Sequence, residues 1–147
     1  MTHTIRQAVE TDLPALLALY AQLKPGESAA ADDAATAAWA EMLANPCMQV
    51  LVAQVEGVPR ATCTLVILPN LTHGRRPYAL VENVVCDAAF RRQGLGLGLL
   101  HAARERARQA GCYKLMLLTG SKAAGTLRFY EKAGYNRVDK TGFVQWL

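Results

Sequence analysis

A glycine-rich turn between a strand-like and a helix-like segment constrains this chain more than any other feature. Residues 91–96 read Arg-Arg-Gln-Gly-Leu-Gly; they follow the apolar stretch 78–86 and open a helical pattern that runs to about residue 110. A helix start leaves backbone N–H groups without carbonyl partners and carries partial positive charge. Glycine at 94 and 96 lets an anion approach those groups. The turn therefore predicts a pyrophosphate site, and a tightly packed helix start is the alternative.

The glycine spacing does not fit the two common nucleotide-binding fingerprints. Gly94, Gly96 and Gly98 give G-x-G-x-G, whereas the dinucleotide fingerprint is G-x-G-x-x-G. A P-loop needs Gly-Lys-Ser/Thr after its glycines, and this chain has none there. Arg91 and Arg92 add fixed positive charge and planar donors beside the turn. The sequence therefore predicts an anion-binding turn of a different kind.

The order of the expected elements is typical of a mixed α/β domain. The expected strands are residues 4–9, 49–55, 61–68, 78–86 and 115–118, with one or two more within 135–147. The expected helices are one that starts near residue 12, one at 33–44, the one after the glycine turn, and one at 124–133. Strand, helix and strand from residue 78 to 118 predict a parallel pair, whereas the earlier strands read as antiparallel.

Composition restricts the classes of function. The chain has 147 residues, 52% of them hydrophobic and 19% charged, which predicts one globular domain over residues 1–147. It shows no leader pattern and no apolar stretch that could span a bilayer, so we expect a cytoplasmic protein. The net charge is +4. Without a lysine tract or alternating basic and aromatic residues, this charge favours a small anion over nucleic acid.

The sequence predicts no metal site. The cysteines and histidines are scattered singly, as Cys47, Cys63, Cys86 and Cys112 and as His3, His73 and His101. Metal sites and redox dithiols usually have closely spaced ligands. The cysteines are therefore interpreted as small buried hydrophobic residues.

Two motifs in register resemble the GNAT superfamily of N-acetyltransferases. The first is R-x-x-G-x-G at residues 91–96, after the apolar strand 81–87. The second is F-Y-E-K-A-G-Y at residues 129–135, which resembles the family's F-Y-x-x-x-G-F/Y. The combination of V-E-N-V-V, G-C-Y-K and F-Y-E-K-A-G-Y is most similar to the glucosamine-6-phosphate N-acetyltransferase branch. The resemblance implies the GNAT fold, with antiparallel N-terminal strands, a splayed parallel pair and about four helices.

The resemblance also implies acetyl-CoA as co-substrate. The strand backbone at residues 84–86 would pair with the pantetheine arm, and the amides of residues 92–96 would hold the pyrophosphate beneath Arg91. The implied cofactor-binding residues are Val84, Val85, Cys86, Arg91, Arg92, Gln93, Gly94, Leu95, Gly96, Phe129 and Tyr130.

Acetyl transfer needs a base for the amine and a proton for the departing thiolate. By resemblance, Tyr130 supplies that proton; an ordinary half-buried aromatic is the alternative. Glu82 is the candidate base, unless it is a solvent-facing strand residue. Asn83 either binds substrate or stabilises a bulge, and His73 either binds an acidic group of the acceptor or lies in a solvated loop. Cys86 has no neighbouring histidine in the sequence, so direct attack in a ternary complex is favoured over an acyl-cysteine.

The acceptor is the least constrained part of the function. The related enzymes have an aspartate where this chain has Leu-Leu-Thr-Gly at 117–120, and an asparagine near the place of Ala123. A sugar phosphate is therefore not favoured, and we expect the primary amine of a small metabolite. A peptide acceptor and a non-catalytic CoA-binding sensor are the alternatives. Family habit implies a homodimer, in which the apolar segment 138–147 either meets a partner or completes the sheet.

Overall fold

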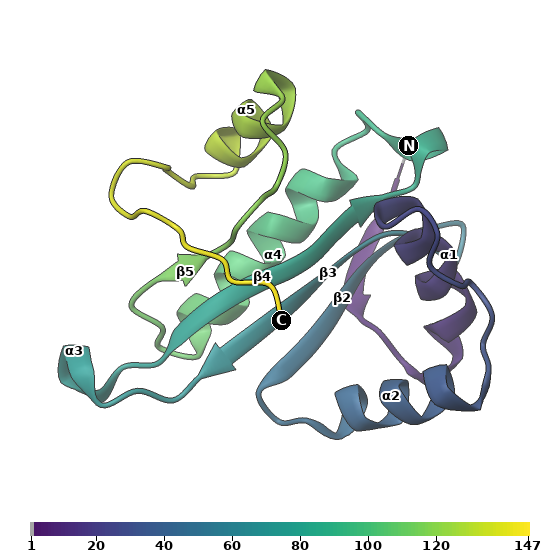
Figure 1. Cartoon of the computed structure of the whole chain (residues 1–147), viewed down its shortest axis with the longest axis horizontal. Helices are drawn as coiled ribbons and strands as arrows, with labels where there is room; N and C mark the ends of the chain where they lie inside the picture. The colour runs from purple at the N-terminus through teal and green to yellow at the C-terminus, as the bar shows by residue number, and fades with distance from the viewer. Residues whose placement is uncertain (1) are drawn as a thin grey trace.

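The computed structural model describes residues 2–147 and is built on a five-stranded sheet (Figure 1). Each strand neighbours the next one in the sequence, in the order β1-β2-β3-β4-β5. The first three pairings are antiparallel and the β4–β5 pairing is parallel, which confirms the predicted mixed α/β sheet. The strands are β1 (Thr4–Gln7), β2 (Met48–Val55), β3 (Val58–Leu68), β4 (Tyr78–Cys86) and β5 (Leu115–Met116).

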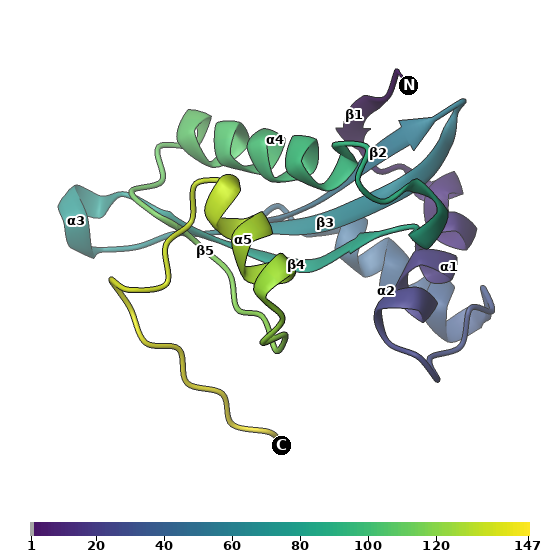
Figure 2. The same ribbon diagram turned by 90° about the horizontal axis from the view of Figure 1, so that it is seen from above.

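Helices cover both faces of the sheet (Figure 2). One face carries α1 (Leu13–Leu23) and α2 (Asp33–Ala44), the other carries α4 (Leu95–Gln109), and α5 (Ala124–Lys132) follows β5. The chain also forms three short turns, η1 (Glu10–Asp12), α3 (Thr72–Arg75) and η2 (Ala88–Phe90). The start of α2 is fixed by Asp32, whose side chain accepts a hydrogen bond from the Ala35 N–H at 2.8 Å.

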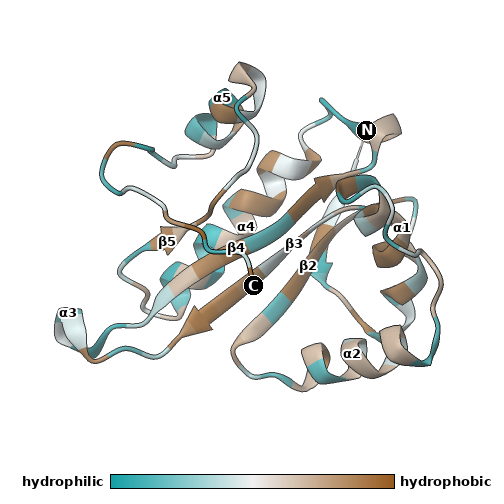
Figure 3. Ribbon diagram, in the orientation of Figure 1, coloured by the Kyte–Doolittle hydropathy of each residue, from teal (hydrophilic) through white to brown (hydrophobic). Residues whose placement is uncertain are grey.

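Alternate residues of the central strands enter two separate cores. In β2, Leu51 and Ala53 pack in the core beneath α4, whereas Val50 and Val52 pack in the core beneath α1 and α2. Because both faces are covered, hydrophobic residues run along most of β2 and β3 (brown in Figure 3), and a hydrophilic stretch interrupts β4 midway. The hydrophilic stretch contains Glu82 and Asn83, both of which are exposed.

A β-bulge interrupts β4 at Asn83. On β3, Thr62 pairs with Val85 and Thr64 pairs with Glu82, so β4 carries one residue more than β3 between these pairs. Asn83 takes up the change in direction with a φ of 51°, in the left-handed region that asparagine tolerates better than most residues. Of the two roles predicted for Asn83, the bulge is the one that the backbone geometry supports.

The two parallel strands separate soon after they meet. They pair only where Ala79 lies beside Leu115 and Leu80 lies beside Met116. Among the described residues, no strand pairs with β4 on this side from residue 81 to 86. The splayed pair is therefore present, and it leaves backbone N–H and C=O groups of β4 open along one edge.

The C-terminal segment departs from the expectation. The prediction of one or two strands within residues 135–147 is wrong: the structure has no strand there. An extended segment becomes a strand only when its backbone pairs with a neighbour, and this one runs away from the sheet on the side of α1 and α2 (Figure 2). Its exposed large apolar side chains are Val138, Phe143, Val144, Trp146 and Leu147.

Candidate active site

A cavity of about 860 Å³ lies where the end of β4, the start of α4 and α5 meet. All the predicted cofactor-binding residues except Gln93 line it. Its lining also contains residues that the sequence did not indicate: Gln22, Leu23, Leu97, Ala123, Gly125, Thr126 and Lys132. The two sequence motifs, almost forty residues apart, thus face one space.

The turn before α4 presents backbone amides to this cavity. Gly94 is the N-cap residue with a φ of 86°, a left-handed conformation that favours glycine. The Gly98 N–H donates to the Gly94 carbonyl at 2.9 Å and so closes the first helical turn. The N–H groups of residues 95–97 lie in the first turn of α4, so no helical carbonyl is available to accept their hydrogen bonds. Together with the helix dipole and the flanking arginines, they make an anion-binding site.

α1 is tied to this turn from the other side of the sheet. The Gln22 side-chain oxygen accepts a hydrogen bond from the Ala88 N–H at 2.9 Å, just before the turn. Ala88 begins η2, and Asp87 caps this short helix: its carboxylate accepts a hydrogen bond from the Ala89 N–H at 3.1 Å. These contacts fix where β4 ends and where the turn begins. Sequence reasoning missed Gln22 because only the tertiary fold brings α1 to this point.

Tyr130 reaches the cavity from α5. Its ring lies 5.0 Å from the ring of Phe129, centroid to centroid, and the residue is half-buried against the core beneath α4. Burial raises the pKa of the Tyr130 phenol above its ordinary value, and the charge of Glu82 raises it further. The hydroxyl is therefore protonated at neutral pH and can act as a proton donor.

Glu82 approaches the same region from the opposite face of the sheet. It pairs with Thr64 across the strands, on the face that α1 and α2 cover, and its side chain is exposed. It does not line the cofactor cavity, but its charge helps to raise the pKa of Tyr130. The carboxylate of Glu82 and the phenol of Tyr130 thus come from opposite faces of the sheet.

His73 lies apart from this site. It belongs to α3, beyond the start of β4, and its ring stacks on Tyr113 at 3.8 Å between centroids. The hydroxyl group of the preceding residue, Thr72, is hydrogen-bonded to His73 Nδ1 at 2.9 Å. The structure therefore does not bring His73 together with Glu82, and it supports the reading of a surface loop.

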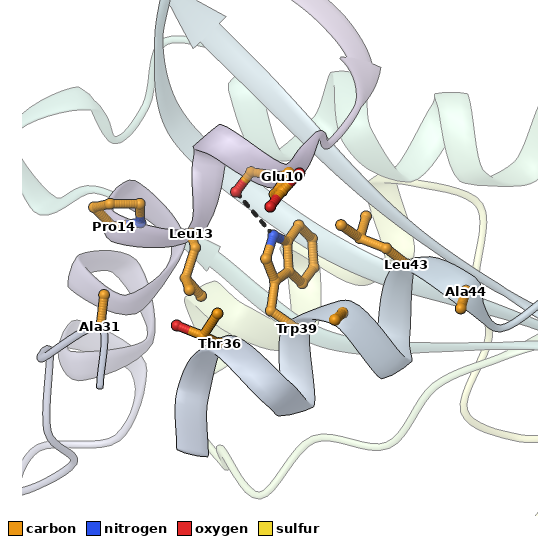
Figure 4. Close-up of a pocket in the computed structure, with 9 residues that line it drawn as sticks. Glu10, Leu13, Pro14, Ala31, Thr36, Trp39, Leu43 and Ala44 are labelled. Carbon is orange, nitrogen blue, oxygen red and sulfur yellow. Dashed lines mark hydrogen bonds between the residues drawn. The ribbon is translucent and has the colours of Figure 1, made fainter. Parts of the chain in front are cut away.

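A second cavity, of about 590 Å³, lies between η1, the start of α1 and α2 (Figure 4). Its walls are mainly apolar, and the Trp39 indole N–H donates to the Glu10 carbonyl oxygen at 3.1 Å. Glu10 is the one titratable residue among those that line it. This second cavity is lined by neither a glycine turn, nor arginines, nor a tyrosine hydroxyl. The first cavity has all three, so it is the candidate active site.

Residues 2–147 contain neither a metal-binding cluster nor a membrane-spanning helix. No group of three or more histidine, cysteine, aspartate or glutamate side chains in this part of the chain is placed to hold a metal ion. No helix in it combines the length and the hydrophobicity that crossing a membrane requires.

Comparison with known proteins gives this geometry a family. The Acetyltransferase (GNAT) family matches residues 13–135. Glucosamine 6-phosphate N-acetyltransferase from Trypanosoma brucei brucei is 32% identical over 131 residues, covering 89% of this chain and 87% of that protein. A solved structure from Agrobacterium tumefaciens str. C58 is 44% identical, with a TM-score of 0.94 and coverage of 98% of this chain and 99% of that one.

A more distant structure extends the likeness of fold. It is AAC(6')-Iy in complex with the bisubstrate analog CoA-S-monomethyl-acetylneamine, 22% identical, with a TM-score of 0.81 and coverage of 100% of this chain and 99% of that one. At this identity the likeness concerns the fold alone. The family match and the Trypanosoma relative establish the rest: this chain belongs to the GNAT family of acetyltransferases, enzymes that use acetyl-CoA.

Proposed function

We propose that the protein transfers the acetyl group of acetyl-CoA to the primary amine of a small metabolite. The observation that carries this proposal is the cavity of about 860 Å³, which joins the anion-binding turn, the open edge of β4 and Tyr130. Each part answers one need of the reaction: binding of the pyrophosphate, alignment of the pantetheine arm, and a proton for the thiolate.

The residues fit acetyl-CoA. The amides of residues 95–97 and the arginines at 91 and 92 would hold the pyrophosphate. Room for it exists at the turn, because no atom lies within 4 Å of a Cβ built on Gly94. The backbone of residues 84–86 on this edge can pair with the amides of the pantetheine arm as a neighbouring strand would, although the Cys86 carbonyl already accepts a long hydrogen bond from Arg91 Nε at 3.4 Å. When bound, acetyl-CoA supplies the acetyl group as a thioester.

The side chains then divide the proton transfers. Glu82 takes a proton from the acceptor ammonium, directly or through a water, so that the nitrogen can attack. Tyr130 gives its proton to the departing sulfur. The amine approaches from the face that carries α1 and α2, because Glu82 lies there, and the reaction proceeds by direct attack in a ternary complex.

The acceptor class rests on weaker support. The Trypanosoma relative is by name an N-acetyltransferase of glucosamine 6-phosphate, which is a small amine. This chain lacks the aspartate that the glucosamine-phosphate enzymes carry near residues 117–120, so we favour a small amine other than a sugar phosphate. Two alternatives have distinct signatures. A peptide acetyltransferase would modify lysine-rich peptides, and a sensor would bind CoA without turnover.

We also propose that the protein works as a homodimer. The exposed segment 138–147 is rich in apolar side chains. On the same side of the sheet, a half-buried apolar row crosses four strands in register, formed by Met48, Val66, Leu80 and Met116. A second copy of the chain would remove both surfaces from water. The cytoplasmic location stays a prediction.

Thermal-shift titration tests the cofactor part of the proposal. Acetyl-CoA that binds only the folded chain must raise the Tm by mass action. We expect a rise for the wild type and none for Gly94→Glu, which places a carboxylate where the pyrophosphate binds. Gly57→Glu is the matched control: Gly57 also has a positive φ, of 79°, and free space around it, but lies in the β2–β3 turn. No rise for the wild type at saturating acetyl-CoA would overturn the proposal.

A further inference from the structure

Three titratable side chains meet in the core beneath the active site, and the mechanism above uses only one of them. Cys63 is fully buried on β3, and Tyr130 and Tyr135 pack against the same core. The ring of Tyr135 meets that of Tyr130 edge to face, with centroids 6.3 Å apart and planes at 83°. Tyr135 is held there by the turn that ends α5, where its N–H donates to the Tyr130 carbonyl at 3.1 Å.

The Tyr135 hydroxyl is the unusual member of this group. It is buried from solvent and makes no hydrogen bond within the described chain. A buried hydroxyl without a partner costs stability, because the hydrogen bonds that it made to water are lost. A phenylalanine would fill the same space without that cost. The hydroxyl therefore needs a role that the resting structure does not display.

The two phenol rings are in edge-to-face contact within one core. Burial is the main reason why the pKa values of both Tyr130 and Tyr135 are raised, and the charge of an ionised Cys63 would raise both further. Both rings pack with Cys63 in the core beneath α4. An ionised Tyr130 raises the pKa of Tyr135, whereas Arg104 on α4 opposes that rise. These charges, with Glu82 on β4, are the ones that act on the pair.

We propose that Tyr135 is a positioning residue whose hydroxyl donates a hydrogen bond to Tyr130 Oη once Tyr130 has given up its proton. The inference rests on the proposed function, which makes Tyr130 the acid. In that step the amine nitrogen forms a bond to the acetyl carbon, the carbon–sulfur bond breaks, and the Tyr130 proton moves to the sulfur. Of the two protons that leave the ammonium nitrogen, one goes through Glu82 to solvent and the other returns to Tyr130.

The hydrogen bond from Tyr135 would stabilise a phenolate at Tyr130, which its surroundings otherwise disfavour. A phenolate at Tyr130 is disfavoured by burial and by the charge of Glu82. A hydrogen bond from a neutral donor to an anion is stronger than one between neutral groups. The Tyr135 hydroxyl, unpartnered beforehand, can therefore stabilise the phenolate without breaking an existing bond. Tyr135 is kept neutral because its own pKa is raised by burial.

The test compares wild type, Tyr135→Phe and the control Tyr113→Phe, in protein labelled with ¹³C at tyrosine Cζ. Tyr113 is also half-buried but stacks on His73, away from the site. The Tyr130 signal is assigned by its loss in Tyr130→Phe. We expect Tyr135→Phe to raise the pKa of Tyr130 and to lower kcat about tenfold, with KM for acetyl-CoA unchanged. Tyr113→Phe should alter neither.

Every outcome is informative. An unchanged pKa of Tyr130 in Tyr135→Phe would overturn the inference. So would a clearly lower Tm of that variant, because it would mean that the hydroxyl already has a partner in the resting enzyme. If the wild type turns over no amine while Tyr135→Phe still raises the pKa of Tyr130, the contact stands and the proposed function fails.

Discussion

The ring of Phe129 lies directly against Gly96: a Cβ atom at position 96 would be 3.1 Å from Phe129 Cζ and 3.4 Å from Phe129 Cε2. Gly96 belongs to the anion-binding turn, and Phe129 precedes the proposed acid, Tyr130. The contact therefore sets the distance between the two ends of the cofactor cavity. Glycine is required here for close packing, whereas at position 94 it is required by the positive φ.

Gly96→Ala tests this contact. The new methyl group should displace Phe129 by a few tenths of an ångström and move Tyr130 with it, so that kcat falls roughly tenfold. Alanine favours a helix over glycine by about 1 kcal/mol, which offsets the crowding, so the free energy of unfolding should change by less than that. Enzyme kinetics and urea unfolding measure the two effects.

Gly98→Ala is the control for Gly96→Ala. It lies on the same helix and its Cβ would meet Ile5 Cδ1 at 2.9 Å, away from the cavity. We expect a similar effect on stability and an unchanged kcat. Equal losses of kcat in the two variants would contradict a specific role for the Gly96–Phe129 contact.

Asp12 should contribute strongly to stability. Its carboxylate is nearly buried and accepts from the Arg6 guanidinium at 2.6 and 2.9 Å and from the Val9 N–H at 2.8 Å. Hydrogen bonding from Arg6 is the main reason why the pKa of Asp12 is lowered. Asp12→Asn should cost about 2 kcal/mol of unfolding free energy at pH 7, somewhat reduced because Arg6 is partly exposed.

The pH dependence of Asp12→Asn follows from the sign of that shift. Because the pKa of Asp12 is lower in the folded chain than its ordinary value of 3.8, its contribution to stability is complete above that pH. The contribution is lost as the pH falls from 3.8 through the pKa of the folded state. Urea unfolding of wild type and variant should therefore converge below about pH 4. Glu131→Gln, which breaks the exposed ion pair with Arg137, is the control and should cost less than about 0.5 kcal/mol. Parallel curves for wild type and Asp12→Asn down to pH 3 would disprove the assignment.

Cys63 should weaken the fold in alkali. Burial raises the pKa of its thiol from 9.0 to about 12, so the unfolded chain loses this proton first. Stability is therefore lost as pH rises above 9, by about 1.4 kcal/mol for each pH unit. Cys63→Ala should show a shallower fall in the urea midpoint between pH 9 and 11 than wild type or Cys47→Ala. Equal slopes in all three would contradict the prediction.

Removing residues 138–147 should separate the proposed dimer. The segment exposes Phe143 and Trp146 at 90% and 85% of their surface, which a second copy would cover. Light scattering should give the mass of a dimer for the full chain and of a monomer for the truncated one. The Tm of the truncated chain should be close to that of the full chain. A wild-type monomer at high concentration would rule out the proposal.

Local patterns explain how much of the fold the sequence could predict. Strand 78–86 has the predicted bounds, because its apolar run ends at a clear helix-start signal. The C-terminal prediction failed for a physical reason: an apolar, β-prone segment forms a strand only beside an open edge, and edges are set by tertiary structure. β5 ends at Met116, two residues before its apolar run does, because there it diverges from β4 although the edge of β4 stays open.

The candidate site divides in the same way. The turn at residues 91–96 and the F-Y motif were visible because each acts through residues adjacent in the sequence. Gln22 and Leu23 line the same cavity without a local signature. His73 was predicted on charge alone, but its ring stacks on Tyr113. A sequence therefore indicates the residues of a local motif more readily than the cavity-lining residues that tertiary structure brings to it.

The most direct measurement of the central claim is CoA thiol release from acetyl-CoA in the presence of a panel of small primary amines. The panel contains amino sugars, aminoglycosides, polyamines and a lysine-rich peptide, with acetylated product detected by mass spectrometry. The account predicts release matched by one acetylated small amine, and a loss of kcat of about a hundredfold in Tyr130→Phe. Binding of acetyl-CoA without turnover of any amine would contradict it and identify a CoA-binding sensor.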